Sequence, residues 1–388
     1  MAQEGKTRWQ RIQAVSRKNR YQNSLLICLL ALAFAAVFLI LTVFSHPKVE
    51  KQEQPVGLSA KTLLDGSWSA GVEEGFRDRF AGRERWLRTG LVMNRLFGAE
   101  ENGGVYLGKD GYLFEKPADR SLENGLKCMK LMERFAASHP ELRVSLITLP
   151  SSWTVLSEKV PEGVVTPNQK GQLNQLQQAA EHVTVVDLTD ALKANKKEVL
   201  YYHTDPHITA LGAARAIEAA SEALGIEPVE FDAYTVSDQY SGYLAVQSGN
   251  VDSMDRIWIS VPKEETAYKV IDPETGEVTT TLFDEKALDS EAPLDVFLSG
   301  GKPETEIITT ANTGRRLLII GDDWARSCLP LLVPSFEMIL FLEPDSGDIH
   351  YEEPIKAEDY TDVLILCSQE TFLRDARLAN LLADGTIE

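Results

Sequence analysis

Residues 317–324 hold the feature that most constrains how this chain can fold. Leu317–Ile320 is apolar throughout, which is typical of a central strand buried on both faces of a parallel sheet. Gly321 follows directly and lets the chain turn sharply into a helix, which we expect over residues 324–332. The pattern predicts an α/β fold with Asp323 at the edge of the sheet, beside the N–H groups of a helix N-terminus.

The rest of the chain has the strand–helix alternation of a parallel sheet. The expected strands are 143–149, 182–188, 316–320, 338–341 and 362–367, and the expected helices are 122–138, 169–181 and 210–224. Residues 104–114 are typical of two strands around a Lys-Asp-Gly turn. We predict a three-layer α/β/α domain over residues 101–388, with a β-rich insertion at about 230–310.

The N-terminal part predicts a membrane anchor. Residues 1–23 carry six basic side chains and one acidic one, a net charge of +5, whereas residues 24–44 carry none. As a helix, these 21 residues would span roughly 31 Å, about the thickness of a bilayer core. Since basic residues precede the span and no Ala-x-Ala site follows it, we expect an uncleaved, single-pass anchor in the cell membrane. Residues 1–23 then form a cytoplasmic tail, 45–100 a stalk with membrane-proximal helices, and 101–388 an extracellular domain.

The charge and the cysteines exclude several classes of protein. The chain has a net charge of −19, so the part after residue 23 carries −24. That excess argues against binding nucleic acid and against lying flat on anionic lipid. The four cysteines have no spacing typical of a disulfide framework or a zinc site. No Walker loop, dinucleotide fingerprint or HExxH is present, and we expect no cofactor.

Asp205 and His207 are candidate catalytic residues. They are two residues apart, and Pro206 favours an extended backbone at Asp205, so both side chains would point the same way. Asp205 could then orient the imidazole, as in a Ser-His-Asp hydrolase. Alternatively, Asp205 caps the helix that begins near Thr209. A third possibility is a zinc site made by His203, Asp205 and His207, although no fourth ligand is evident.

The place of the expected nucleophilic serine is taken by Asp323. Aspartate is a favoured N-cap residue, so it could simply begin the helix. As a nucleophile, it would form a mixed anhydride with an acyl group. Ser327 lies one helical turn farther on and is a possible displaced nucleophile. If Asp323 and Asp205 both approach His207, the imidazole should favour its charged form.

Residues 65–388 resemble the DHHW family, relatives of the AlgJ/AlgX alginate O-acetylation proteins with an SGNH-hydrolase-like fold. The resemblance is carried by six blocks in the family's order: NGGVYLGKDGYLFE (102–115), TLPSSWTVLSEKVP (148–161), YYHTDPHITALGA (201–213), YSGYLAVQSG (240–249), VFLSGGKPETEII (296–308) and LLIIGDDWARSCLPLL (317–332).

The resemblance also implies roles for individual residues. The family's D-x-H pair falls on Asp205 and His207, and the serine of its Asp-Ser pair falls on Asp323, after Asp322. Further departures from the family pattern are Pro206, Ile208, Ser152 and Leu156.

Two functions follow from the resemblance. We expect a catalytically degenerate accessory protein of envelope polysaccharide O-acetylation, which binds the glycan or a membrane-bound O-acyltransferase. The alternative is an active carbohydrate O-acetyltransferase or acetylesterase that uses His207 and Asp205 with Asp323 or Ser327 as a non-standard nucleophile.

Overall fold

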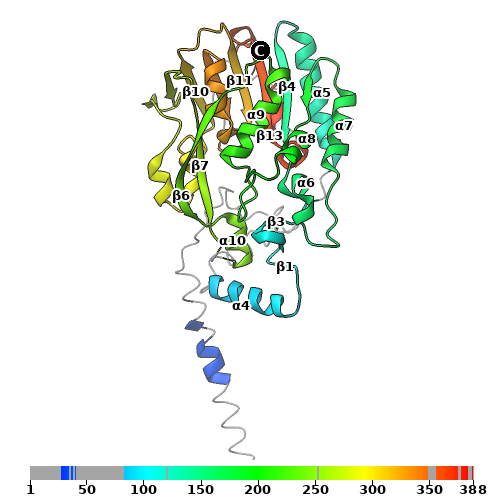
Figure 1. Cartoon of the computed structure of the whole chain (residues 1–388), viewed down its shortest axis with the longest axis vertical. Helices are drawn as coiled ribbons and strands as arrows, with labels where there is room; N and C mark the ends of the chain where they lie inside the picture. The colour runs from blue at the N-terminus through cyan, green and yellow to red at the C-terminus, as the bar shows by residue number, and fades with distance from the viewer. Residues whose placement is uncertain are drawn as a thin grey trace, which may run out of the picture. The chain divides into compact units, whose positions relative to one another are not determined.

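The computed structural model (Figure 1) describes residues 28–34, 36–37, 40, 83–118, 121–250, 253–347, 355–374, 377–382 and 387. The chain divides into two compact units, residues 1–85 and 86–388. In the first unit, the described residues between 28 and 40 are helical. No helix in the described part of the chain combines the length and apolar character needed to cross a bilayer. The predicted tail, the stalk over 45–82 and much of the predicted anchor 24–44 lie outside the described residues.

A mostly parallel sheet organises the second unit. Among the described residues, its eight strands run in the order β5-β4-β13-β11-β12-β10-β8-β9. The first five are parallel to one another. They are β5 (Thr184–Val186), β4 (Arg143–Leu149), β13 (Asp362–Ser368), β11 (Arg316–Gly321) and β12 (Met338–Leu342). Each of these strands was expected from the sequence, and β11 lies among them with a neighbour on either side.

The region predicted as an insertion contributes to this sheet, which differs from our expectation. Three of its strands extend the sheet in antiparallel fashion: β10 (Glu304–Thr309), β8 (Tyr268–Ile271) and β9 (Val278–Thr279). Ile307 in β10 is buried and Ile308 is exposed, because an antiparallel part of a sheet can have one face in contact with solvent. Among the described strands of this region, β6 (Phe231–Tyr240) and β7 (Asp255–Pro262) form a separate pair.

Helices cover both faces of the sheet, as the three-layer prediction required. Leu317 and Ile319 of β11 belong to a core shared with α9 (Ala210–Leu224). Leu318 and Ile320 belong to the core shared with α5 (Leu122–Ser138). This alternation follows from the two-residue period of a strand and buries β11 on both sides. The prediction of an α/β fold with a mostly parallel sheet is confirmed.

Local sequence signals set several boundaries. Helix α9 begins after Thr209, whose hydroxyl accepts the N–H of Gly212, and it ends at Gly225 in the left-handed conformation. The turn at Lys109–Gly111 (η1) lies between β2 (Val105–Leu107) and β3 (Leu113–Glu115), as predicted.

The remaining elements are β1 (Glu101–Asn102), α4 (Arg83–Leu96), α6 (Ser152–Val155), η2 (Ser157–Lys159), α7 (Gln169–Ala179), α8 (Thr189–Ala194), α10 (Tyr243–Ser248), η3 (Glu285–Asp289), η4 (Pro293–Val296), η5 (Asp323–Ser327), α11 (Leu329–Leu332), η6 (Val333–Ser335), η7 (Ala357–Asp359), α12 (Gln369–Arg374) and α13 (Arg377–Asn380).

Candidate functional site

The turn after β11 has the predicted glycine but not the predicted helix. A Cβ on Gly321 would lie 2.4 Å from the carbonyl oxygen of Leu366, so only glycine allows this approach. The helix expected over 324–332 is instead the short 3-10 turn η5, and α11 starts at Leu329. Pro330 explains the difference, because it has no N–H to continue an α-helix through this turn.

Asp322, not Asp323, caps this turn. One carboxylate oxygen of buried Asp322 accepts the N–H of Trp324 at 3.2 Å, and the other accepts the N–H of Ser368 at 2.9 Å. Burial and the neighbouring charge of Asp323 raise the pKa of Asp322 to about 7. The interpretation of Asp323 as the helix cap is therefore wrong, and its side chain is left for another contact.

Asp205 and His207 lie in a tight loop before α9. The ends of this loop are joined by a bridge between Tyr201 and Ile208. Asp205 Oδ1 accepts the backbone N–H of His207 at 3.1 Å and lies 2.6 Å from its Nδ1. Because Thr209 caps α9, the alternative in which Asp205 is the cap is wrong.

Two further groups hold the Asp205 carboxylate, and the sequence did not indicate them. Its Oδ2 accepts the hydroxyl of Tyr240 at 2.7 Å and the backbone N–H of Tyr243 at 3.0 Å. Both residues lie in the block 240–249 that carries the family resemblance, but nothing local to that block marks them as partners of Asp205. The carboxylate is thus fixed from β6 and from the start of α10.

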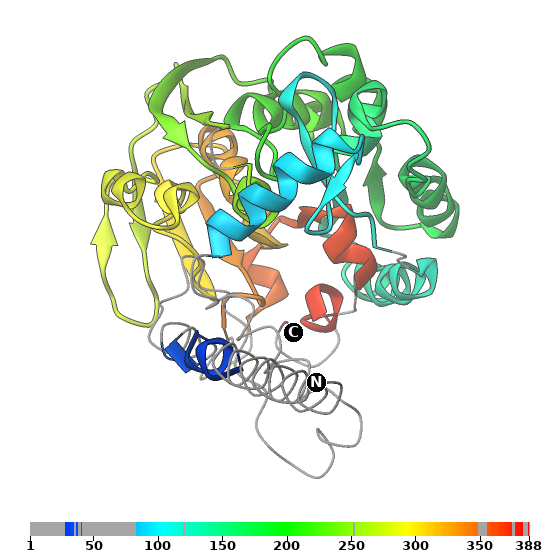
Figure 2. The same ribbon diagram turned by 90° about the horizontal axis from the view of Figure 1, so that it is seen from below.

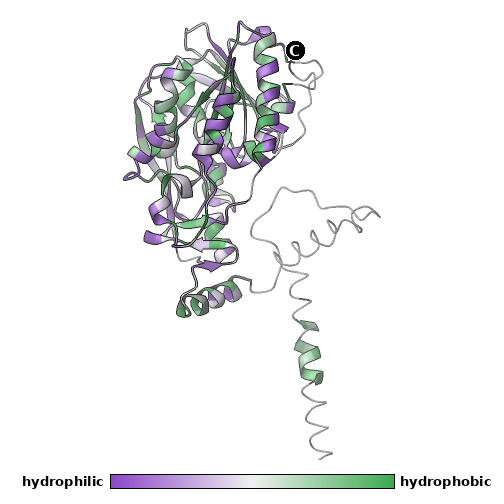
Figure 3. Ribbon diagram, turned by 90° about the vertical axis from the view of Figure 1, so that its right-hand side faces the viewer, coloured by the Kyte–Doolittle hydropathy of each residue, from purple (hydrophilic) through white to green (hydrophobic). Residues whose placement is uncertain are grey.

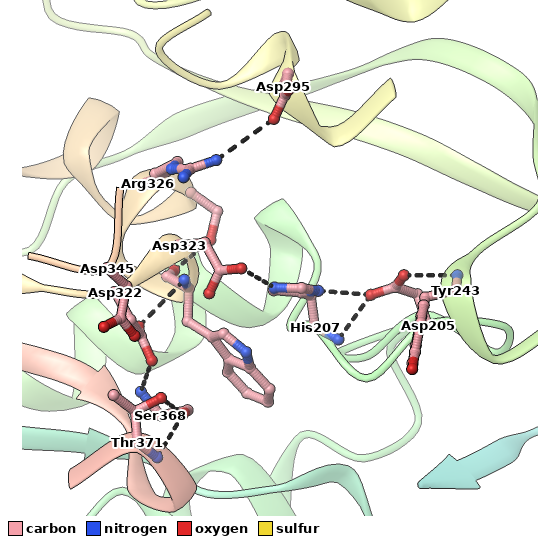
Figure 4. A network of polar contacts seen from close by, with 12 residues as sticks. Asp205, His207, Tyr243, Asp295, Asp322, Asp323, Arg326, Asp345, Ser368 and Thr371 are labelled. Carbon is pink, nitrogen blue, oxygen red and sulfur yellow. Dashed lines mark hydrogen bonds and ion pairs between the residues drawn. The ribbon is translucent and has the colours of Figure 1, made fainter. Parts of the chain in front are cut away.

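Asp323 completes a line of three charged side chains (Figure 4). His207 Nε2 lies 3.1 Å from Asp323 Oδ2, while its Nδ1 faces Asp205. The side chain of Asp323 is 49% exposed and that of His207 24%. The ring of Trp324 lies 5.4 Å from the imidazole, centroid to centroid. The structure therefore brings Asp205, His207 and Asp323 together.

Ser327 does not join this group. Its buried hydroxyl donates to the carbonyl oxygen of Trp324 at 3.2 Å. In the part of the chain that the structure describes, no hydrogen bond connects Ser327 with His207. A nucleophile in this position would lack the base that must remove its proton.

Electrostatics favour a charged imidazole between two charged carboxylates. Burial alone would lower the pKa of His207, but the charges of Asp323 and Asp205 and their hydrogen bonds raise it well above 6.5. Burial alone would raise the pKa of Asp323 and of Asp205, yet the charge of His207 and the hydrogen bonds that each carboxylate accepts together outweigh it and lower both. At neutral pH, the side chain of His207 is therefore an imidazolium held at both nitrogens.

A second buried carboxylate fixes the loop that carries the site. Asp255 in β7 accepts the backbone N–H groups of His203 and Thr204, at 3.0 and 2.7 Å. It also accepts the hydroxyl of Thr204, which in turn accepts the N–H of Gly242 at 2.9 Å. One acid thus joins the loop before α9 to the loop that presents Tyr243 to Asp205.

His203 takes no part in a metal site with Asp205 and His207. Its Nδ1 lies 2.9 Å from Asp255, and its ring stacks on Tyr112 with centroids 4.0 Å apart. Among the described residues, no three His, Cys, Asp or Glu side chains are grouped to hold a metal ion. The zinc interpretation does not fit this arrangement.

Arg326 forms a second charged cluster beside the site. Its guanidinium pairs with buried Glu343 and lies 3.4 Å from Asp295 (Figure 4). The charge of Arg326 also contributes to the low pKa of Asp323, after the contribution of His207. Two cationic side chains, those of His207 and Arg326, therefore act on the Asp323 carboxylate.

Residues 105–290 match the family model described as "SGNH hydrolase-like domain, acetyltransferase AlgX". A DHHW family protein from Eubacterium siraeum is similar in structure, with a TM-score of 0.61 and 18% identity over 74% of this chain and 97% of that one. Bacillus cereus PatB1, determined with a sulfonyl adduct, has a TM-score of 0.56 and 17% identity over 69% and 95%. No protein of curated function matches the sequence. The predicted resemblance is confirmed, and the match covers Asp205 and His207 but ends before Asp323.

Proposed function

We propose that this chain is a catalytically inactive, membrane-anchored SGNH-like accessory protein of envelope polysaccharide O-acetylation. The observation that carries the proposal is the 3.1 Å contact between His207 Nε2 and Asp323 Oδ2. In a Ser-His-Asp site, this nitrogen takes the proton of the attacking hydroxyl. Here it already bears a proton and faces a carboxylate.

Two consequences of this contact oppose acyl transfer. An imidazolium cannot act as a general base until it loses its proton, and two carboxylates hold that proton in place. The developing oxyanion of a tetrahedral intermediate would also lie near the negative charge of Asp323, which repels it. The fold is thus kept, while the group that would carry the acetyl is missing.

The match to an acetyltransferase family model supports a place in O-acetylation. On this proposal, the domain binds an envelope polysaccharide or a membrane-bound O-acyltransferase, and residues 24–44 anchor it with the N-terminus in the cytoplasm. A reporter enzyme that is active only outside the cytoplasm, fused after Glu388, tests the topology. Activity of a matched fusion at the N-terminus would contradict it.

Hydrolysis of a chromogenic acetyl ester by the full chain tests the inactivity. We expect no turnover above that of the matched variant His207→Ala. Turnover that this variant abolishes would overturn the proposal. Chemical cross-linking in intact cells, followed by purification of the chain, then identifies whether a glycan or an acyltransferase is bound.

A second candidate function is acyl transfer through Asp323 itself. It is favoured by the exposure of this carboxylate beside a charged imidazole, which could give its proton to the leaving alkoxide. The carboxylate oxygen would attack the acyl carbon, the donor ester bond would break, and a mixed anhydride would remain. Hydroxylamine cleaves such an anhydride, so trapping of the acyl group from wild type but not from Asp323→Asn would establish this function.

A further inference from the structure

Helix α4 is fixed to the domain through one of its faces. Leu91 on this face is buried, and the Asn102 side chain donates to the carbonyl oxygen of Leu87 at 3.3 Å. Gly249 lies so close that a Cβ there would be 2.6 Å from the carbonyl carbon of Leu87. Figure 2 shows α4 crossing the face of the molecule that is seen from below.

Another face of the same helix is apolar and exposed. The exposed fractions are 59% for Trp86, 48% for Met93, 74% for Leu96 and 82% for Phe97. Trp86, Met93 and Phe97 are seven and four residues apart and lie on one side of a helix. The N–H of Phe97 bonds to the carbonyl oxygen of Met93 at 3.1 Å, so the helical turn includes Phe97. We call Trp86, Met93 and Phe97 the α4 apolar face, and Figure 3 shows the mixed hydropathy of the helix.

The charge of this segment indicates its partner. Residues 83–97 contain four arginines and one glutamate, a net charge of +3 in a chain of −19. A helix that combines several arginines with exposed tryptophan and phenylalanine is typical of helices that lie in a membrane interface. Between the uncharged run 24–44 and the start of α4 lie 38 residues, 45–82. A bilayer is therefore within reach of this segment if the run is an anchor.

We propose that α4 lies on the surface of an anionic membrane, with the α4 apolar face inserted at the level of the lipid headgroups. This inference rests on the proposed anchoring but not on whether the site is active. The −24 carried by the chain after residue 23 opposes contact of the whole domain with such a surface. The basic segment 83–97 is the exception, so lipid contact is confined to α4.

Trp86 provides a direct test with the full-length chain. The chain is reconstituted into nanodiscs of phosphatidylcholine and phosphatidylglycerol in which the phosphatidylcholine carries bromine near the headgroup. Bromine quenches only indoles that touch lipid. We expect the quenched fraction of tryptophan emission to fall in Trp86→Phe and not to fall in the matched variant Trp258→Phe, which alters a half-buried tryptophan of β7.

The outcomes separate this inference from the proposed anchoring. A chain that is held in the disc but shows equal quenching in wild type and Trp86→Phe contradicts only the inference. An unquenched Trp86, in discs that hold one copy or two, shows that lipid does not contact the α4 apolar face. Each result overturns the inference. A chain that does not enter the discs contradicts both the anchoring and the inference.

Discussion

Replacing Asp323 by serine should restore an esterase if only the nucleophile is missing. The carboxylate oxygen of Asp323 lies 3.1 Å from His207 Nε2. A serine hydroxyl is one bond nearer the backbone, about 1 Å short of that oxygen. The distance from Oγ to Nε2 would then be about 4 Å, beyond the 2.6–3.2 Å or so of a working nucleophile–base pair, unless the turn closes.

The expected gain follows from this distance. Removing the serine of an intact triad costs on the order of 10⁶ in kcat, and a misplacement of about 1 Å costs about 10². We therefore expect Asp323→Ser to hydrolyse acetyl esters on the order of 10⁴-fold faster than wild type. The rate should rise with pH as His207 loses its proton, because only the neutral imidazole can act as the base.

Initial rates on a chromogenic acetyl ester measure this gain between pH 5 and pH 9, a range of about two units either side of neutrality. Asp323→Asn is the matched control, since it removes the charge without supplying a hydroxyl. The double variant Asp323→Ser/His207→Ala should return to the wild-type background. Equal rates for Asp323→Ser and Asp323→Asn would refute the reasoning and show that the site lacks more than a hydroxyl.

Four further predictions concern the loop and its charges. NMR titration should find the pKa of His207 above 6.5 and lower in Asp323→Asn; an unchanged value in the variant would exclude the ion pair. Folding raises the pKa of His207 and lowers that of Asp323, so their ion pair stabilises the fold fully between about pH 3.8 and 6.5. This stabilisation is lost as the pH rises through the folded-state pKa of His207. In urea unfolding, the loss of unfolding free energy caused by Asp323→Asn should therefore become smaller at alkaline pH. Asp255→Ala leaves buried donors of Thr204 unpaired and should lower the free energy of unfolding by about 2–5 kcal/mol. Asp255→Asn should cost less, and equal losses for the two variants would count against the role of the Asp255 hydrogen bonds. Gly242→Ala places a Cβ 2.5 Å from the carbonyl oxygen of Thr204, so a loss of about 1–3 kcal/mol is expected and unchanged stability would contradict this packing.

Local signals made part of this fold predictable. The bounds of α9 and β4 match the sequence-based expectation, because Thr209 and Gly225 mark the helix and Pro150 follows the strand. The proximity of Asp205 and His207 is also local, since two residues of one loop must lie together. The position of Asp323 just after a central strand was also predictable, because the apolar run Leu317–Ile320 ends at Gly321.

The support of the site could not be predicted in this way. Tyr240 is 35 residues from Asp205, and Asp255 is 51 residues from Thr204, so both contacts depend on how β6 and β7 return to the loop. Asp255 looks like any other acid in a chain with 58 acidic residues. That strands β8–β10 extend the main sheet was missed for a related reason, because the pairing of β10 with β12 and of β8 with β10 is a tertiary choice that overrides weak local patterns.

The short strands at the two edges of the described sheet also affect the tendency of the protein to aggregate. The described sheet ends in β5, which has three residues, and in β9, which has two. Strands this short offer few unpaired amide groups to a neighbouring chain. Molecules packed densely side by side would therefore find little edge on which to build an intermolecular sheet, and the sheet can stay large without becoming a seed for aggregation.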